Sequence, residues 1–65
     1  MQPISREKLF ELLSTSEIPG LDDQIQILCV RVGELLEMNG EQWVRQHHLK
    51  LLAEWRYVIE QGILE

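Results

Sequence analysis

Two stretches of helical apolar periodicity, separated by Asn39-Gly40, constrain the fold of this chain more than any other feature. The first runs from Leu21 to Leu36, and its apolar residues fall within about a third of a helix circumference at about 100° per residue. The residues of this first face are Leu21, Ile25, Leu28, Val32, Leu35 and Leu36. The second stretch is centred on Trp55, with the apolar residues Val44, Leu51, Leu52, Val58 and Ile59 and the polar residue His48 on the same side.

Asn39-Gly40 is the strongest signal for a break between these two stretches. Glycine favours the left-handed position that ends a helix, and asparagine is a good cap for the helix that follows. A connection this short joins antiparallel neighbours. The sequence therefore predicts a helical hairpin, with helices over about 22–38 and 41–61.

A third, shorter helix is predicted before the hairpin. Ser5 is a good N-cap and Glu7 suits the first turn, while Leu9, Leu12 and Leu13 form an apolar stripe over about 6–15. Pro19-Gly20 separates this helix from the hairpin. The fold class that we expect is all-α: three helices, with the short N-terminal helix packed on an antiparallel helical hairpin in a single domain over 1–65.

The charge balance indicates the kind of partner. The chain has 6 Lys and Arg against 11 Asp and Glu, a net charge of −5. Most of the acidic excess lies between Glu17 and Glu37, which disfavours nucleic acid and favours a basic protein surface. We expect Asp23, Glu34 and Glu37 to rim an apolar groove and to bias the choice of partner.

Chemistry-bearing motifs are missing from the sequence. Cys29 is the only cysteine, so no internal disulfide and no cysteine cluster for zinc can form. No phosphate-binding loop, nucleophile elbow or metalloprotease helix motif occurs. We therefore expect no enzyme activity, no catalytic residue and no cofactor. No apolar run reaches the roughly 18 residues that would span a bilayer, and a free thiol suits a reducing compartment, so we expect no membrane association and a cytoplasmic location.

The pair His47-His48 raises the one alternative function. Adjacent helical residues point about 100° apart, and neither histidine has a metal-ligating residue four positions away. A metal site would need ligands from another helix or chain, so we assign no metal ligands. The alternative is a metal- or ligand-binding protein that uses His47 and His48 across a dimer interface.

The function that we favour is inferred from apolar surface that the predicted hairpin would leave exposed. Domains this small are marginally stable alone, and the helix over 22–38 is apolar around more of its circumference than a hairpin buries. A second protein chain would cover that surface. We expect a small non-enzymatic protein-interaction module, a regulator or adaptor that acts through an apolar helical face, with a protein partner and a homodimer. The predicted partner-binding residues are Ile27, Val30, Met38, Trp43, His47 and Tyr57.

Overall fold

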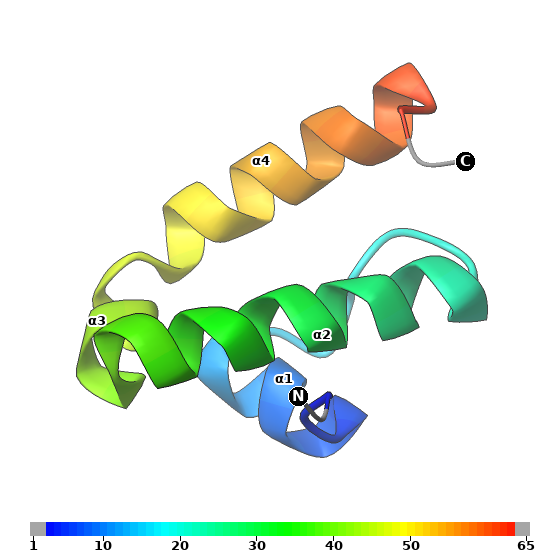
Figure 1. Ribbon diagram of the computed structural model, residues 1–65. Coiled ribbons are helices and arrows are strands. Elements are labelled where there is room, and N and C mark those ends of the chain that lie inside the picture. Colours follow the sequence, from blue (N-terminus) through cyan, green and yellow to red (C-terminus); the bar gives the residue numbers. More distant parts are fainter. Residues whose placement is uncertain (1–2, 64–65) are drawn as a thin grey trace.

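The computed structural model describes residues 3–63, and all of its regular structure is helical. Its four helices are α1 (Arg6–Leu12), α2 (Asp22–Asn39), α3 (Glu41–Gln46) and α4 (His48–Gln61). Figure 1 shows α1 on one side of α2 and α4 on the other, with α3 at the corner where the chain reverses. The all-α class is confirmed, whereas the expected number of three helices is wrong. None of the helices in the described part is long and apolar enough to cross a membrane.

Helix α1 is shorter than the sequence predicts. Ser5 caps it as expected, because its Oγ accepts a hydrogen bond from the Lys8 backbone N–H at 3.1 Å. The helix ends at Leu12 rather than near Thr15, because Ser14 takes a left-handed conformation with φ 55°. That turn directs the chain into the segment 15–21, which leads to α2.

Helix α2 matches its predicted range to within one residue at its C-terminal end. Asp22 and Asp23 lie in its first turn, where negative charge suits the helix dipole. The cap itself is Leu21, whose backbone N–H donates to Gln24 Oε1 at 2.6 Å. At the other end, Gly40 (φ 89°, ψ 162°) is the single residue between α2 and α3, so the predicted break is confirmed. The expected roles are wrong, because Asn39 ends α2 and does not cap α3, and Gly40 is not left-handed helical.

The predicted helix over 41–61 is wrong, because the chain breaks at His47 (φ −106°, ψ 16°). In a continuous helix the Arg45 carbonyl would accept the backbone N–H of Leu49. Here His48 Nδ1 lies 2.8 Å from the Arg45 carbonyl oxygen, and a side chain takes the place of that backbone bond. His48 consequently lies half-buried at the start of α4, not over the centre of the core as the periodicity predicts.

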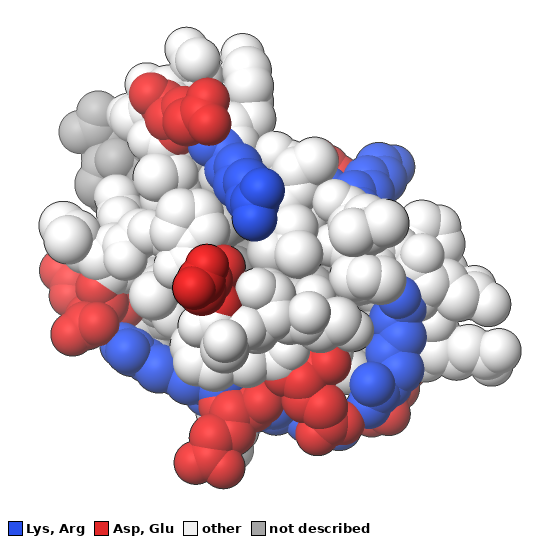
Figure 2. Space-filling view, turned by 180° about the vertical axis from the view of Figure 1, so that it is seen from behind, with Lys and Arg blue, Asp and Glu red and all other residues white. Residues whose placement is uncertain are grey.

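The core joins α1, α2, α3 and α4 through one cluster. Its buried members are Leu9, Leu12, Leu13, Ile25, Leu28, Cys29, Val32, Val44, Leu52 and Trp55. Trp55 also makes the polar link between α4 and the loop before α2, because its Nε1–H donates to the Pro19 carbonyl at 2.7 Å. Figure 2, which shows the molecule from behind, has acidic and basic side chains interspersed on that face.

Candidate functional site: the groove between helices α2 and α4

Helices α2 and α4 do not close fully against each other, and an open groove of about 350 Å³ lies between them. From α2 the apolar residues that line it are Leu28, Val32, Leu35 and Met38. From α4 they are Leu51, Trp55 and Val58. The lining is mostly apolar, and its two walls come from segments that are distant in the sequence.

The groove has a buried floor and an exposed edge. Leu28, Val32 and Trp55 are buried members of the core, so the floor of the groove is part of the hydrophobic core of the domain. Leu35, Leu51 and Val58 are half-buried, and Met38 at the edge is 77% exposed. An apolar partner would therefore extend the core outward without disturbing it.

Three charged residues complete the lining: Arg31 and Glu34 from α2, and Glu54 from α4. Among the described residues, none of the three has an ion-pair partner within 4.0 Å. The groove thus has charges of both signs beside an apolar floor. Of the acidic residues predicted to rim a groove, Glu34 lines this one, whereas Asp23 and Glu37 do not.

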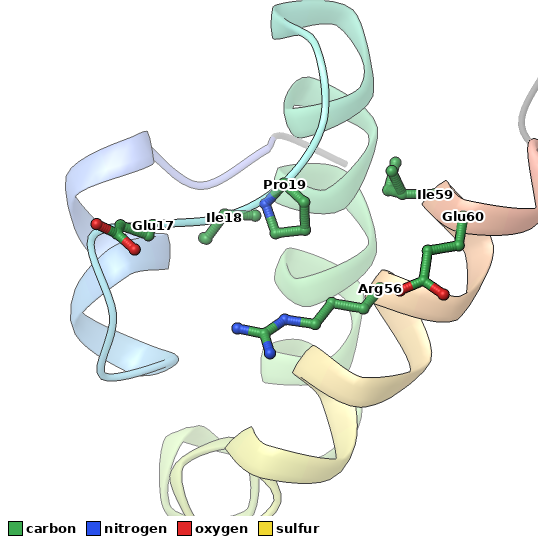
Figure 3. A pocket seen from close by; sticks show the side chains of 6 residues that line it. All are labelled: Glu17, Ile18, Pro19, Arg56, Ile59 and Glu60. Atoms are coloured by element: carbon green, nitrogen blue, oxygen red, sulfur yellow. The ribbon is translucent and has the colours of Figure 1, made fainter.

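The chain turn at His47 and the loop before α2 both contribute to the position of α4. Trp43 packs against the core, and its ring stacks on that of His47 at 4.2 Å between centroids, on the α3 side of the break. Further along α4, the Trp55–Pro19 hydrogen bond ties the helix to the loop. Beside that bond lies a second hollow, of about 410 Å³, which Figure 3 shows with Arg56 pointing toward the loop.

Of the six residues that we predicted to bind a partner, one lines the groove. That residue is Met38. Tyr57 is 60% exposed and lies in a shallow hollow with Leu49 and Ala53, outside the α2–α4 groove. Trp43, His47, Ile27 and Val30 are half-buried elsewhere. The periodicity instead placed Leu35, Leu51 and Val58 in the core, because it shows which side of a helix is apolar and not how closely two helices approach.

In both histidines one ring nitrogen forms a hydrogen bond with a backbone carbonyl group three or four residues earlier in the chain. His47 Nδ1 lies 2.8 Å from the Trp43 carbonyl oxygen, and His48 Nδ1 is bonded to Arg45 in the same way. A carbonyl oxygen only accepts, so Nδ1 must hold the proton in each ring. Within residues 3–63 no cluster of three or more metal-ligating side chains is found. No specific observation therefore favours the metal-binding alternative.

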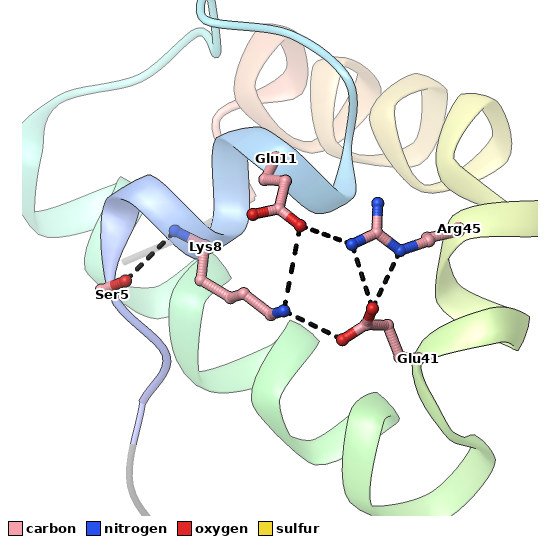
Figure 4. A network of polar contacts seen from close by, with 5 residues as sticks. All are labelled: Ser5, Lys8, Glu11, Glu41 and Arg45. Atoms are coloured by element: carbon pink, nitrogen blue, oxygen red, sulfur yellow. Dashed lines mark hydrogen bonds and ion pairs between the residues drawn. The ribbon is translucent and has the colours of Figure 1, made fainter.

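A ring of four charged side chains holds α1 against α3 (Figure 4). Lys8 Nζ donates to Glu41 at 2.9 Å, and Arg45 pairs with Glu41 at 3.0 Å and with Glu11. Lys8 lies 4.0 Å from Glu11 and closes the ring. The hydrogen bonds from Lys8 and Arg45 lower the pKa of the Glu41 carboxyl below its usual value of 4.5. This ring is fully paired and lies away from the groove, so its role is in holding α1.

Comparison with known proteins adds no assignment, since no protein family, curated protein or solved structure matches this chain. The fold and the groove themselves define a class: a small all-α protein with an open apolar groove between two helices.

Proposed function

We propose that this chain is a small non-enzymatic protein-interaction module, a regulator or adaptor, and that the α2–α4 groove is its binding site. The observation that supports this proposal most directly is the groove, with an exposed methionine at its edge and half-buried leucine and valine walls. When a partner covers apolar surface of this kind, the complex is stabilised by about 25 cal/mol per Å² of buried apolar area.

The shape of the groove suits a helical partner. Grooves between two helices commonly bind the apolar face of a third helix, whose side chains enter at intervals of three or four residues. Met side chains adapt to different partner shapes, which suits an edge residue such as Met38. The charged residues at the groove would then set orientation and partner choice more than affinity.

The distribution of polar groups around the groove favours binding over catalysis. Arg31, Glu34 and Glu54 are all exposed, and the floor beneath them consists of Leu28, Val32 and Trp55. General acid–base catalysis needs a side chain that a site holds within hydrogen-bond reach of the reacting group. A location in the cytoplasm, where the Cys29 thiol stays reduced, is part of the same proposal.

Site-specific photocrosslinking tests the proposal in cells that express the protein. A photoreactive residue replaces Met38 in one variant and Glu7 in the control, since Glu7 is exposed on α1 and lies outside the groove. We expect protein adducts from position 38 and few from position 7. Equal yields from the two positions, or no adduct from position 38, would contradict a binding role for the groove.

A further inference from the structure

We propose that the occupant of the groove is a second copy of this chain, packed groove to groove about a two-fold axis. This inference rests on the proposed function, because it names the partner of the same site. In the dimer, α2 of each copy lies against α4 of the other. The two α2 helices and the two α4 helices together form an antiparallel four-helix bundle. Such bundles are a recurrent way for helical hairpins to bury apolar surface.

The charges at the groove are the first argument for a second copy. Arg31 lies on α2 and Glu54 on α4, and neither has an ion-pair partner in the described part of the chain. With α2 against α4 of the other copy, Arg31 approaches Glu54 of the partner subunit, and the two-fold axis forms the same pair again. A uniformly basic partner would pair with Glu34 and Glu54 but would place positive charge against Arg31, whereas a second copy offers charges of both signs.

Size is the second argument. A chain of 65 residues has one small core, and domains of this length commonly gain stability by oligomerisation. A standard interface covers about 800 Å² on each partner. The accessible surface of this chain is 4550 Å², so a dimer would cover less than a fifth of it. An interface of that size would cover the groove together with the surface of α2 and α4 around it.

The exposed hydrophobic residues elsewhere on α4 do not suit a closed dimer as well. Leu49, Ala53 and Tyr57 recur at four-residue intervals and therefore share one side of α4. That side lies roughly opposite Trp55 at about 100° per residue, so it faces away from the groove. Inserting it into the groove of another copy would join unlike surfaces, which favours open chains rather than closed dimers.

Sedimentation equilibrium over a range of concentrations is the first test. We expect the wild-type chain to be a dimer that dissociates on dilution. Met38→Glu should weaken the dimer at least about tenfold, because it places a charge at the apolar edge. Leu49→Glu is the matched control: Leu49 is 72% exposed and outside the groove, and we expect less than about threefold change. Both residues are largely exposed, and circular dichroism should show unchanged helix content in both variants.

A charge exchange between two chains tests the pairing. Arg31→Glu gives copies with only negative charge at the groove, and Glu54→Arg replaces one of its carboxylates with a guanidinium. Each variant alone should dimerise more weakly than wild type, since each juxtaposes like charges at positions 31 and 54. An equimolar mixture should form a heterodimer tighter than either homodimer, because both pairs are then restored between chains. A mixture no tighter than the variants alone would contradict the proposed arrangement.

The outcomes separate the two proposals. A wild-type chain that stays monomeric, while position 38 crosslinks to a different protein, overturns the self-association inference and leaves the proposed function standing. A dimer that responds to Leu49→Glu and not to Met38→Glu, with no adduct from position 38, overturns both. Self-adducts from position 38, together with dissociation by Met38→Glu, support both.

Discussion

Gly40 determines the local path of the chain more directly than any other single residue. Its conformation, φ 89° and ψ 162°, lies in a region that is open essentially only to glycine. It is the only residue between α2 and α3, so the reversal at this corner depends on its backbone. Beyond Gly40 and the residues next to it, no atom lies within 4 Å of where a Cβ would stand, so the constraint comes from the backbone conformation and not from crowding.

We predict that Gly40→Ala lowers the free energy of unfolding by about 1–3 kcal/mol, the cost of holding a residue with a Cβ in this region. Gly62→Ala is the control. Gly62 also has open space around it, but its φ of 65° and ψ of 34° are left-handed helical values that cost alanine about 1–2 kcal/mol, and it lies at the end of α4. Urea denaturation measures both losses, and a Gly40→Ala variant as stable as the wild type would show that the corner does not require the backbone freedom of glycine.

The two histidines provide a second prediction about individual residues. Because carbonyl oxygens accept the hydrogen bonds at Nδ1, the neutral rings of His47 and His48 should both be Nδ1–H tautomers. Long-range ¹H–¹⁵N correlation spectra at pH 8 distinguish the two tautomers directly. Nε2–H tautomers in both rings would show that the carbonyls of Trp43 and Arg45 are not the partners and would remove our explanation for the chain break.

Among the elements, α1 depends most on its surroundings. Seven residues are too few for a stable isolated helix, so α1 exists through Leu9 and Leu12 in the core and through the ionic ring that joins it to α3. Exposed ion pairs individually contribute little, and a closed ring with alternating signs is the arrangement in which they contribute most. The ring therefore makes the docking of α1 sensitive to pH and to salt.

We predict that this docking weakens in acid through Glu41. Since the pKa of Glu41 is lowered in the folded state, its contribution is fully present above the ordinary value of 4.5 and is lost as the pH falls through the lowered value. Glu41→Gln should weaken protection of the α1 amides from hydrogen exchange at pH 6 and should have less effect at pH 3. Glu60→Gln, on α4 and outside the ring, should change neither. A Glu41→Gln effect that persists at pH 3, or that is indifferent to 1 M salt, would contradict the ionic origin.

The sequence predicted some elements well and others poorly, for identifiable reasons. Helix α2 was predicted almost to the residue, because Pro19-Gly20, a long apolar face and Gly40 agree on its limits. The break at His47 was missed, because the apolar spacing of Val44, Leu51 and Trp55 continues across it. What interrupts the helix is a competition for one carbonyl oxygen between a side chain and the backbone, and hydrophobic periodicity contains no information on that competition.

For the whole molecule, the difference between core and binding surface depends on how far apart two helices lie. Most of the two predicted apolar faces lie against the core, but Leu21 is 74% exposed, His48 lies away from the centre, and the separation of α2 and α4 was not predicted. Leu35, Leu51 and Val58 consequently changed from expected core residues to walls of a groove. Met38 differs from these three residues, since it lies away from the main apolar face of α2 and was predicted to bind a partner. Its role in binding remains a prediction.

Self-association should also be visible in thermal unfolding. If folding and dimerisation are linked, the unfolding midpoint rises with protein concentration, by roughly 3–6 °C for each tenfold increase in a domain of this size. Met38→Glu should lower the midpoint at a given concentration by at least about that amount, which is the effect of a tenfold weaker dimer, while Leu49→Glu should lower it less. A wild-type midpoint independent of concentration over two decades would contradict a linked dimer.

The single thiol of the chain lies where the first helix meets the second. Cys29 is fully buried in the cluster with Leu9, Leu12 and Leu13, and the Ile4 N–H bonds to its carbonyl at 3.4 Å. Burial raises the pKa of the Cys29 thiol, and nearby Arg6 offsets this in part. An alkylating reagent can thus reach the sulfur only when the packing around it opens, so the labelling rate of the unmodified protein reports how often the core opens at this place.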